Sequence, residues 1–245
     1  MSTVVAPGRA MQLSYGIVLR QLITRGRVVA LGMVGIVVVL VSALVGAADD
    51  RSDPVETGVR LISDLGFTTL VPIVALVFAS AALGDMREDG TLVYLWLRPM
   101  DRWPIVVGAW LAAITVSLPL TLVPLVASSV ALDGGSDLVV ATAVAGVVGV
   151  LAYSALFVLV GLVLKNAIVW GLGYVLIWEG IVAAFGSFAA RLAIRGYTRS
   201  IITSITEVDL DLGDLSLAAG ILVPLVASVV ALALGSYRLR VMDVA

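Results

Sequence analysis

Residues 28–48 read VVALGMVGIVVVLVSALVGAA, a stretch without a single charged side chain. A helix needs about 20 mainly apolar residues to cross the hydrocarbon core of a bilayer. The whole chain of 245 residues is 61% hydrophobic and only 13% charged, and a water-soluble core of this size could not hide so much apolar surface. The stretch therefore predicts a membrane-spanning helix in an integral membrane protein.

Five further apolar runs follow, and we expect each of them to span the membrane. They cover residues 61–83, 105–132, 138–164, 167–188 and 215–234. Their apolar residues are continuous rather than alternating, which excludes a sheet barrel. The sequence thus predicts an all-α membrane protein with six transmembrane helices, forming one membrane domain over residues 1–245 and ending in a short tail at 235–245.

Two segments outside these runs have a mixed composition. Residues 11–26 carry apolar side chains at the spacing of an amphipathic helix on the inner membrane surface. Residues 189–214 are too interrupted to span the membrane and too apolar for a free loop. We expect one or two short external helices there, possible re-entrant elements that form an outer lid.

The distribution of charge predicts the orientation. Basic residues concentrate before the first span, in the loop at 84–104 and in the tail, whereas the first external loop and residues 133–137 are mainly acidic. Cytoplasmic loops carry an excess of Lys and Arg. We therefore expect a multi-pass protein of the cell membrane with both termini in the cytoplasm.

Several chemistries are excluded by composition. The chain has no cysteine and no histidine, which removes disulfides, thiolate and imidazole catalysis and most zinc or copper sites. A net charge of −2 without a dense basic stripe argues against nucleic acid as a partner. There is no phosphate-binding loop, and Lys165 is the only lysine. We expect no catalytic or metal site, and any ATP hydrolysis would belong to another polypeptide.

The most informative segment is the cytoplasmic loop GDMREDGTLVYLWLRPMDRW, residues 84–103. A charged cluster leads to Gly90 and Thr91, and Thr91 is suited to cap a short amphipathic helix that Pro99 would end. Such a helix would lie parallel to the membrane. On residue chemistry alone, it could anchor the neighbouring spans or bind a partner protein.

This loop resembles the first cytoplasmic loop of ABC-2 type transporter permeases. That family shows an acid–Arg–Glu–x–Gly–Thr–Leu run, a Leu-rich turn and Pro–x–x–Arg before the third helix. The matching positions, with Arg98 in the same loop, are Asp85, Arg87, Glu88, Gly90, Thr91, Leu92, Leu95, Arg98, Pro99 and Arg102. Val93 and Tyr94 depart from the family, which often has an acid there.

The resemblance implies an ABC transporter permease. In the family this loop is the coupling helix that binds the ATP-binding cassette subunit, and the segment at 11–26 corresponds to the elbow helix. The stretch YVLIWEG at 174–180 and the segment after it are similar to the family's fifth helix and external helices. The implied assembly contains two permease copies in the bilayer and separate ATPase subunits, which carry ATP and Mg²⁺.

Glu179 is the one carboxylate within the expected fifth span. Ionisable residues inside a membrane segment are functional candidates. Glu179 could pair with Arg191 or Arg195 as a structural link, line or gate the outer end of a translocation path, carry protons, or simply lie exposed at the outer interface.

Three functional classes follow from these features. The first is an ATP-driven exporter permease, and the second is an ion-gradient-driven secondary carrier or channel, for which Glu179 is almost the only polar candidate within the spans. The third is a membrane enzyme, which the missing His and Cys and the absence of paired acidic motifs disfavour. The identity of the substrate cannot be read from the spans.

Overall fold

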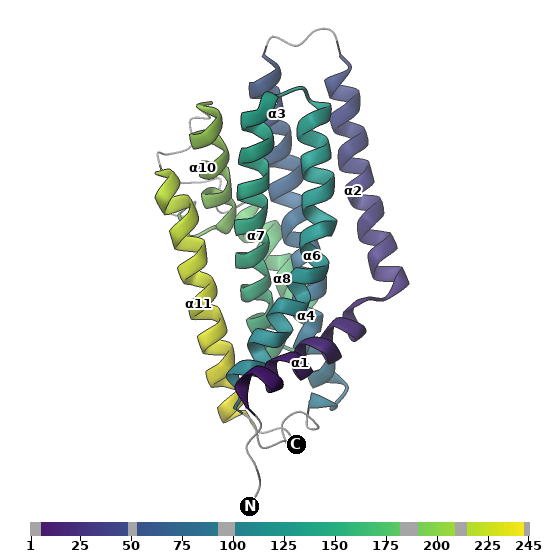
Figure 1. Ribbon diagram of the computed structural model, residues 1–245, viewed down its shortest axis with the longest axis vertical. Helices are drawn as coiled ribbons and strands as arrows, with labels where there is room; N and C mark the ends of the chain where they lie inside the picture. Colours follow the sequence, from purple (N-terminus) through teal and green to yellow (C-terminus); the bar gives the residue numbers. More distant parts are fainter. Residues whose placement is uncertain (1–5, 49–52, 93–100, 182–190, 209–214, 243–245) are drawn as a thin grey trace, which may run out of the picture.

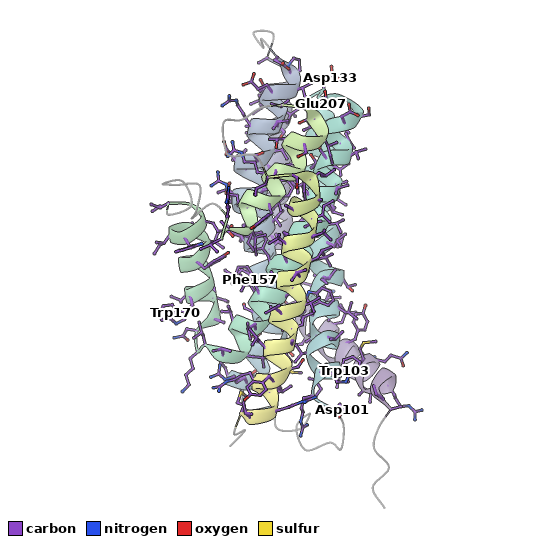
Figure 2. The ribbon with its side chains drawn as sticks, turned by 90° about the vertical axis from the view of Figure 1, so that its left-hand side faces the viewer. Asp101, Trp103, Asp133, Phe157, Trp170 and Glu207 are labelled. Carbon is purple, nitrogen blue, oxygen red and sulfur yellow. The ribbon has the colours of Figure 1, made fainter. Side chains whose placement is uncertain are left out.

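The computed structural model describes residues 6–48, 53–92, 101–181, 191–208 and 215–242, and these contain helices and no strands. Figure 1 shows long helices running side by side along one axis. Figure 2 places Asp133 and Glu207 at one end of the bundle and Asp101 and Trp103 at the other, here called the Asp133 end and the Trp103 end. The chain is therefore an all-helical bundle, as predicted.

Five helices are long and apolar enough to cross a membrane. They are α2 (Arg25–Gly46), a continuous helix made of α3 (Pro54–Leu61), η1 (Ile62–Leu70) and α4 (Val71–Glu88), then α6 (Trp103–Ala131), α7 (Gly135–Val163) and α11 (Leu217–Val241). They correspond to five of the six expected spans. The start of α1 and the end of α11 both lie at the Trp103 end, so the two termini are on the same side (Figure 1).

The second spanning helix is longer at both ends than the predicted 61–83. It begins at Pro54 because the Asp53 side chain accepts hydrogen bonds from Val55 N and Glu56 N, a local cap outside the apolar run. It continues to Glu88, so the first residues of the expected loop at 84–104 are helical. Its 35 residues extend about 52 Å, well beyond a hydrocarbon core of about 30 Å.

A widened π-helical segment, η1, interrupts this long helix immediately before Pro72. Proline lacks a backbone N–H and its ring clashes with the carbonyl four residues earlier. The wider turn of η1 accommodates the proline, and the Val71 N–H bonds to the Gly66 carbonyl five residues back.

The expected fifth span, 167–188, is not confirmed. The described part forms α8 (Ala167–Gly173) and η2 (Tyr174–Glu179), whose 13 residues extend only about 20 Å. Residues 182–190 lie outside the described part. The helix α10 (Ile194–Thr206) then lies alongside α7 and α11 toward the Asp133 end (Figure 1). This helix falls within the segment expected at 189–214.

Helix α1 (Pro7–Leu22) lies across the Trp103 end of the bundle (Figure 1) and starts and stops about four residues earlier than the expected 11–26. Its buried face is small, with Ala10, Ser14, Val18 and Leu22. The Ser14 hydroxyl donates to the Ile105 carbonyl over 2.9 Å, which fixes α1 to the start of α6. At the other terminus, α11 continues to Val241, so most of the expected tail is helical.

Close backbone contact between α4 and α7 forms the centre of the bundle. A Cβ atom at Gly161 would collide with the Ser80 carbonyl, and one at Gly84 would come within 3.4 Å of Gly161 Cα. Small residues allow helices to approach this closely in membranes, where packing drives association. The crossing of α4 and α7 therefore depends on Gly161.

Gly161→Ala is expected to lower the stability of the bundle by about 1–3 kcal/mol, because a methyl group at a filled position forces the two backbones apart. The measurement is thermal unfolding of the purified protein in a mild detergent, followed by tryptophan fluorescence. Gly32→Ala in α2 is the matched control, since a Cβ there meets nothing within 4 Å. Equal midpoints for the two variants would contradict the assigned crossing.

Candidate functional site

The base of the loop between α4 and α6 is tied to the start of α2. Arg27 Nη2 lies 2.9 Å from Asp85 Oδ2, and both side chains are about one-third exposed. Asp85 lies in the last turns of α4, whereas Arg27 is in the first turn of α2. The ion pair therefore links two helices at the Trp103 end, and it uses a carboxylate that the sequence suggested for binding a partner.

A second tie connects α4 with the turn between α7 and α8. The Asn166 backbone N–H donates to Glu88 Oε1 over 3.0 Å. Asn166 has a left-handed backbone (φ 55°), a conformation that asparagine tolerates better than most residues. This turn directs its N–H toward the end of α4, so Glu88 holds the beginning of α8 in place.

The remaining residues of the expected coupling segment divide into described and undescribed positions. Gly90 has a positive φ of 68° and forms the turn that ends α4, and the Thr91 hydroxyl donates back to the Met86 carbonyl. Leu92 is buried, and Arg102 lies at the start of α6. Arg87 has a buried Nη1 that finds no hydrogen-bond partner among the described residues. Leu95, Arg98 and Pro99 lie outside the described residues, as does the body of the predicted short helix.

Glu179 is at the centre of a buried polar cluster, and only 2% of the residue is exposed. Its carboxylate accepts hydrogen bonds from the Tyr153 hydroxyl of α7, from the Tyr174 hydroxyl over 2.8 Å and from the Ile194 backbone N–H over 3.0 Å. Phe157, labelled midway along the bundle in Figure 2, stacks on the Tyr153 ring. A carboxylate without water in apolar surroundings needs such donors.

This cluster joins two helix ends that face one another. Ile194 is the first residue of α10, and Glu179 is the last residue of η2. The positive end of the α10 dipole and its free N–H groups suit a carboxylate. From the opposite side, Arg195 Nη1 lies 3.4 Å from the Glu179 backbone carbonyl. Glu179 thus connects the end of η2 with the start of α10.

The depth of the cluster follows from its partner on α7. Tyr153 is ten residues before Val163, the last residue of α7 at the Trp103 end, which is about 15 Å along a helix about 43 Å long. Glu179 therefore lies closer to the middle of the bundle than to the Asp133 end. The sequence had placed it toward the outer face, as part of an outer gate. Simple exposure at the interface is wrong for this carboxylate, and the expected pairing with Arg195 involves the backbone of Glu179.

A group of charged residues lies between α3–η1 and α10. Arg60 pairs with Glu56 within α3, and Arg195 Nη2 lies 3.4 Å from Asp64 Oδ1. Arg199, one turn further along α10, is partly buried. Burial lowers the pKa of its guanidinium, the Asp64 carboxylate raises it, and Arg195 and Arg60 lower it further.

Four residues of these sites were missed in the sequence because their roles depend on tertiary contacts. Arg27 was counted only as a basic residue near the membrane, and Tyr153 is 26 positions from Glu179. Tyr174 is five residues before Glu179, which is one turn of a π-helix and not of an α-helix. Asn166 acts through its backbone, which no side-chain pattern reveals.

Tyr153→Phe is expected to destabilise the protein by about 1–3 kcal/mol, because the buried Glu179 carboxylate loses one of its donors. Thermal unfolding in detergent measures the change. Tyr237→Phe on α11 is the matched control, since Tyr237 is 65% exposed. A Tyr153→Phe midpoint indistinguishable from that of Tyr237→Phe would contradict the importance of this hydrogen bond.

The chain matches no protein-family model and none of the curated proteins with which it was compared.

Proposed function

We propose that this chain is the transmembrane permease subunit of an ABC transporter, an ATP-driven exporter that works as a pair of permeases with separate ATP-binding subunits. In this proposal the Trp103 end faces the cytoplasm, and ATP and Mg²⁺ bind on the partner subunits. The chain itself is not an enzyme. The observation that carries the proposal is the pair of ties at the base of the 84–104 loop.

The Arg27–Asp85 ion pair and the Asn166–Glu88 hydrogen bond would allow a partner that moves the loop to move several helices. Any displacement at the end of α4 acts on α2 through Arg27–Asp85 and on the start of α8 through Glu88–Asn166. Helix α1 packs on α6 beside them. An ATPase that contacts the loop and α1, the proposed elbow helix, would therefore reach several membrane helices at once. The resemblance of residues 84–103 to a coupling loop supports the same role.

Transport would then require two states that the ATPases favour differently. We propose six membrane elements, the fifth beginning with α8–η2. A carboxylate buried inside a membrane protein is a candidate for a transport site. The Glu179 cluster, between the end of η2 and the start of α10, would form part of the pathway.

A second permease copy would contribute the other half of the pathway. Helices α2 and α11 are the least buried of the five spans, with 22% of their apolar windows covered. Their exposed apolar side chains include Met33, Ile36, Leu40, Leu44, Leu222, Val226 and Val230. Lipid or the second copy would cover these faces in the assembly.

Co-purification tests the proposed ATPase partner. We expect the chain, expressed with proteins from its neighbouring reading frames, to copurify with an ATP-binding cassette protein and to stimulate its ATPase activity. Charge reversal at Arg87 and Glu88 together is expected to weaken this association severalfold in protein whose size-exclusion profile and thermal midpoint show that it is still folded without the Glu88–Asn166 hydrogen bond. Stable binding and full stimulation by this variant would contradict docking on the loop.

A charge swap tests the coupling role of Arg27 and Asp85 separately. Arg27→Asp and Asp85→Arg are each expected to lower ATP-dependent transport, because each places like charges side by side, and the double variant is expected to recover it. Arg25→Asp is the matched control, since Arg25 is exposed in the same turn. Failure of the double variant to recover transport, with normal folding, would contradict coupling through this pair.

The alternative function, an ion-gradient-driven carrier, is favoured by one observation: a buried carboxylate near the middle of the bundle. Glu179→Gln keeps the shape and removes the ionisable proton. If Glu179 serves the pathway, transport is expected to fall while the variant remains folded. Transport that follows an ion gradient without ATP would select the carrier, whereas unchanged transport would remove Glu179 from both mechanisms.

A further inference from the structure

Three arginines from two separate elements lie near Asp64. Arg60 belongs to α3, and Arg195 and Arg199 belong to α10; we call these three residues the arginine cluster. The acids that act on it are Glu56 and Asp64, so three positive charges face two negative ones. Helix α10 packs against α3 and η1. Neither the ATPase coupling nor the Glu179 cluster uses this excess charge.

The existing ion pairs leave one arginine unsatisfied. Arg60 Nη2 lies 2.7 Å from Glu56 Oε1, a close pair along one helix face. Asp64 reaches Arg195 only at 3.4 Å, and 62% of its side chain is exposed to solvent. Arg199 forms no ion pair within the described residues, and its Nε is buried without a hydrogen-bond partner.

An unpaired guanidinium in this position is costly. Its burial removes water from the charge, and Arg60 and Arg195 add like-charge repulsion that Asp64 only partly offsets. A buried or half-buried charge normally has a partner with matching hydrogen-bond acceptors. The fork of an arginine side chain matches the oxygens of a phosphate group, and two nearby arginines suit it better than one.

The surroundings suggest where that phosphate would come from. Exposed apolar side chains lie close in the chain to Arg195: Leu192 stands three residues before it, and Ile177 and Ile181 flank Glu179, whose carbonyl contacts Arg195. A phosphate carried on acyl chains could place its head at the arginines and its tails on these residues. Basic pockets between membrane helices on the cytoplasmic side of a bilayer bind anionic headgroups in this way, and the arginine cluster would be a corresponding pocket toward the opposite face.

We propose that the arginine cluster is a binding site for the phosphate group of an anionic membrane lipid, with Arg199 as the principal contact. This inference goes beyond the transport function and does not depend on an ATPase. Asp64 competes with the lipid for Arg195 and Arg199, so it sets the affinity. The lipid would occupy the junction of η1 and α10.

The test measures binding of dioleoyl phosphatidic acid to the full chain in a neutral maltoside detergent by native mass spectrometry. Dioleoylglycerol, which has the same tails without phosphate, and inorganic phosphate are the two comparison probes. Arg199→Gln is expected to weaken phosphatidic acid binding about tenfold, in line with the loss of a charge-assisted hydrogen bond. Arg191→Gln is the matched control, because this exposed arginine lies outside the residues acting on Arg199.

A second variant, expected to strengthen lipid binding, distinguishes loss of the site from misfolding of Arg199→Gln. Asp64→Asn removes the competing carboxylate and is expected to tighten binding about threefold, a change that general destabilisation would not produce. Arg199→Lys keeps the charge without the fork and is expected to lie between the wild type and Arg199→Gln. Size-exclusion profiles and thermal midpoints establish that each variant is folded.

Each outcome bears on the proposal. Selective loss with Arg199→Gln and a gain with Asp64→Asn support the lipid site. Equal binding of dioleoylglycerol, equal losses with Arg191→Gln and Arg199→Gln, or no effect of either Arg199 variant would overturn it. Displacement of phosphatidic acid by millimolar inorganic phosphate would identify a free-phosphate site and overturn the lipid assignment. None of these results depends on whether an ATP-binding partner is found.

Discussion

Backbone amides and carbonyls have no water to bond to inside a bilayer, and this constraint shapes every element of the chain. The five helices that are long and apolar enough to span it meet most of this demand with their own backbone hydrogen bonds. The start of α10 needs an acceptor from outside the helix, because the first N–H groups of a helix have none within it. The Glu179 carboxylate supplies an acceptor by taking a hydrogen bond from the Ile194 N–H. Tyr153 and Tyr174 donate further hydrogen bonds to the same carboxylate.

The sequence predicts most of the bundle because apolar length is a local property. The run at 28–48 becomes α2, and the ends of α6 and α7 fall within about three residues of prediction. Prediction fails where a polar contact decides. Asp53 starts a helix ahead of the apolar run. Of the predicted span at 167–188, the described residues confirm a helix from Ala167 to Glu179, and 182–188 lie outside them.

The candidate sites were less accessible to prediction than the fold. Asp85 and Glu88 stand out by their motif, yet Arg27 and the Asn166 backbone N–H, which bind them, are distant in the chain. The sequence identifies Glu179 as a carboxylate within an apolar run, but its position along the bundle is known only from its contact with Tyr153. Arg195 and Arg199 lie in the segment expected outside the membrane, and only the fold shows that they lie near Asp64.

The continuous helix from Pro54 to Glu88 has a mechanical consequence. A continuous helix longer than the membrane is thick can act as a lever, and the close contact between Gly84 and Gly161 is a natural fulcrum near one end. The arm from that contact to Glu88 is short, whereas the arm to Pro54 is about seven times longer by residue number. A small tilt imposed at the short arm would sweep Asp64 and Arg60 through a much larger arc, carrying them relative to α10.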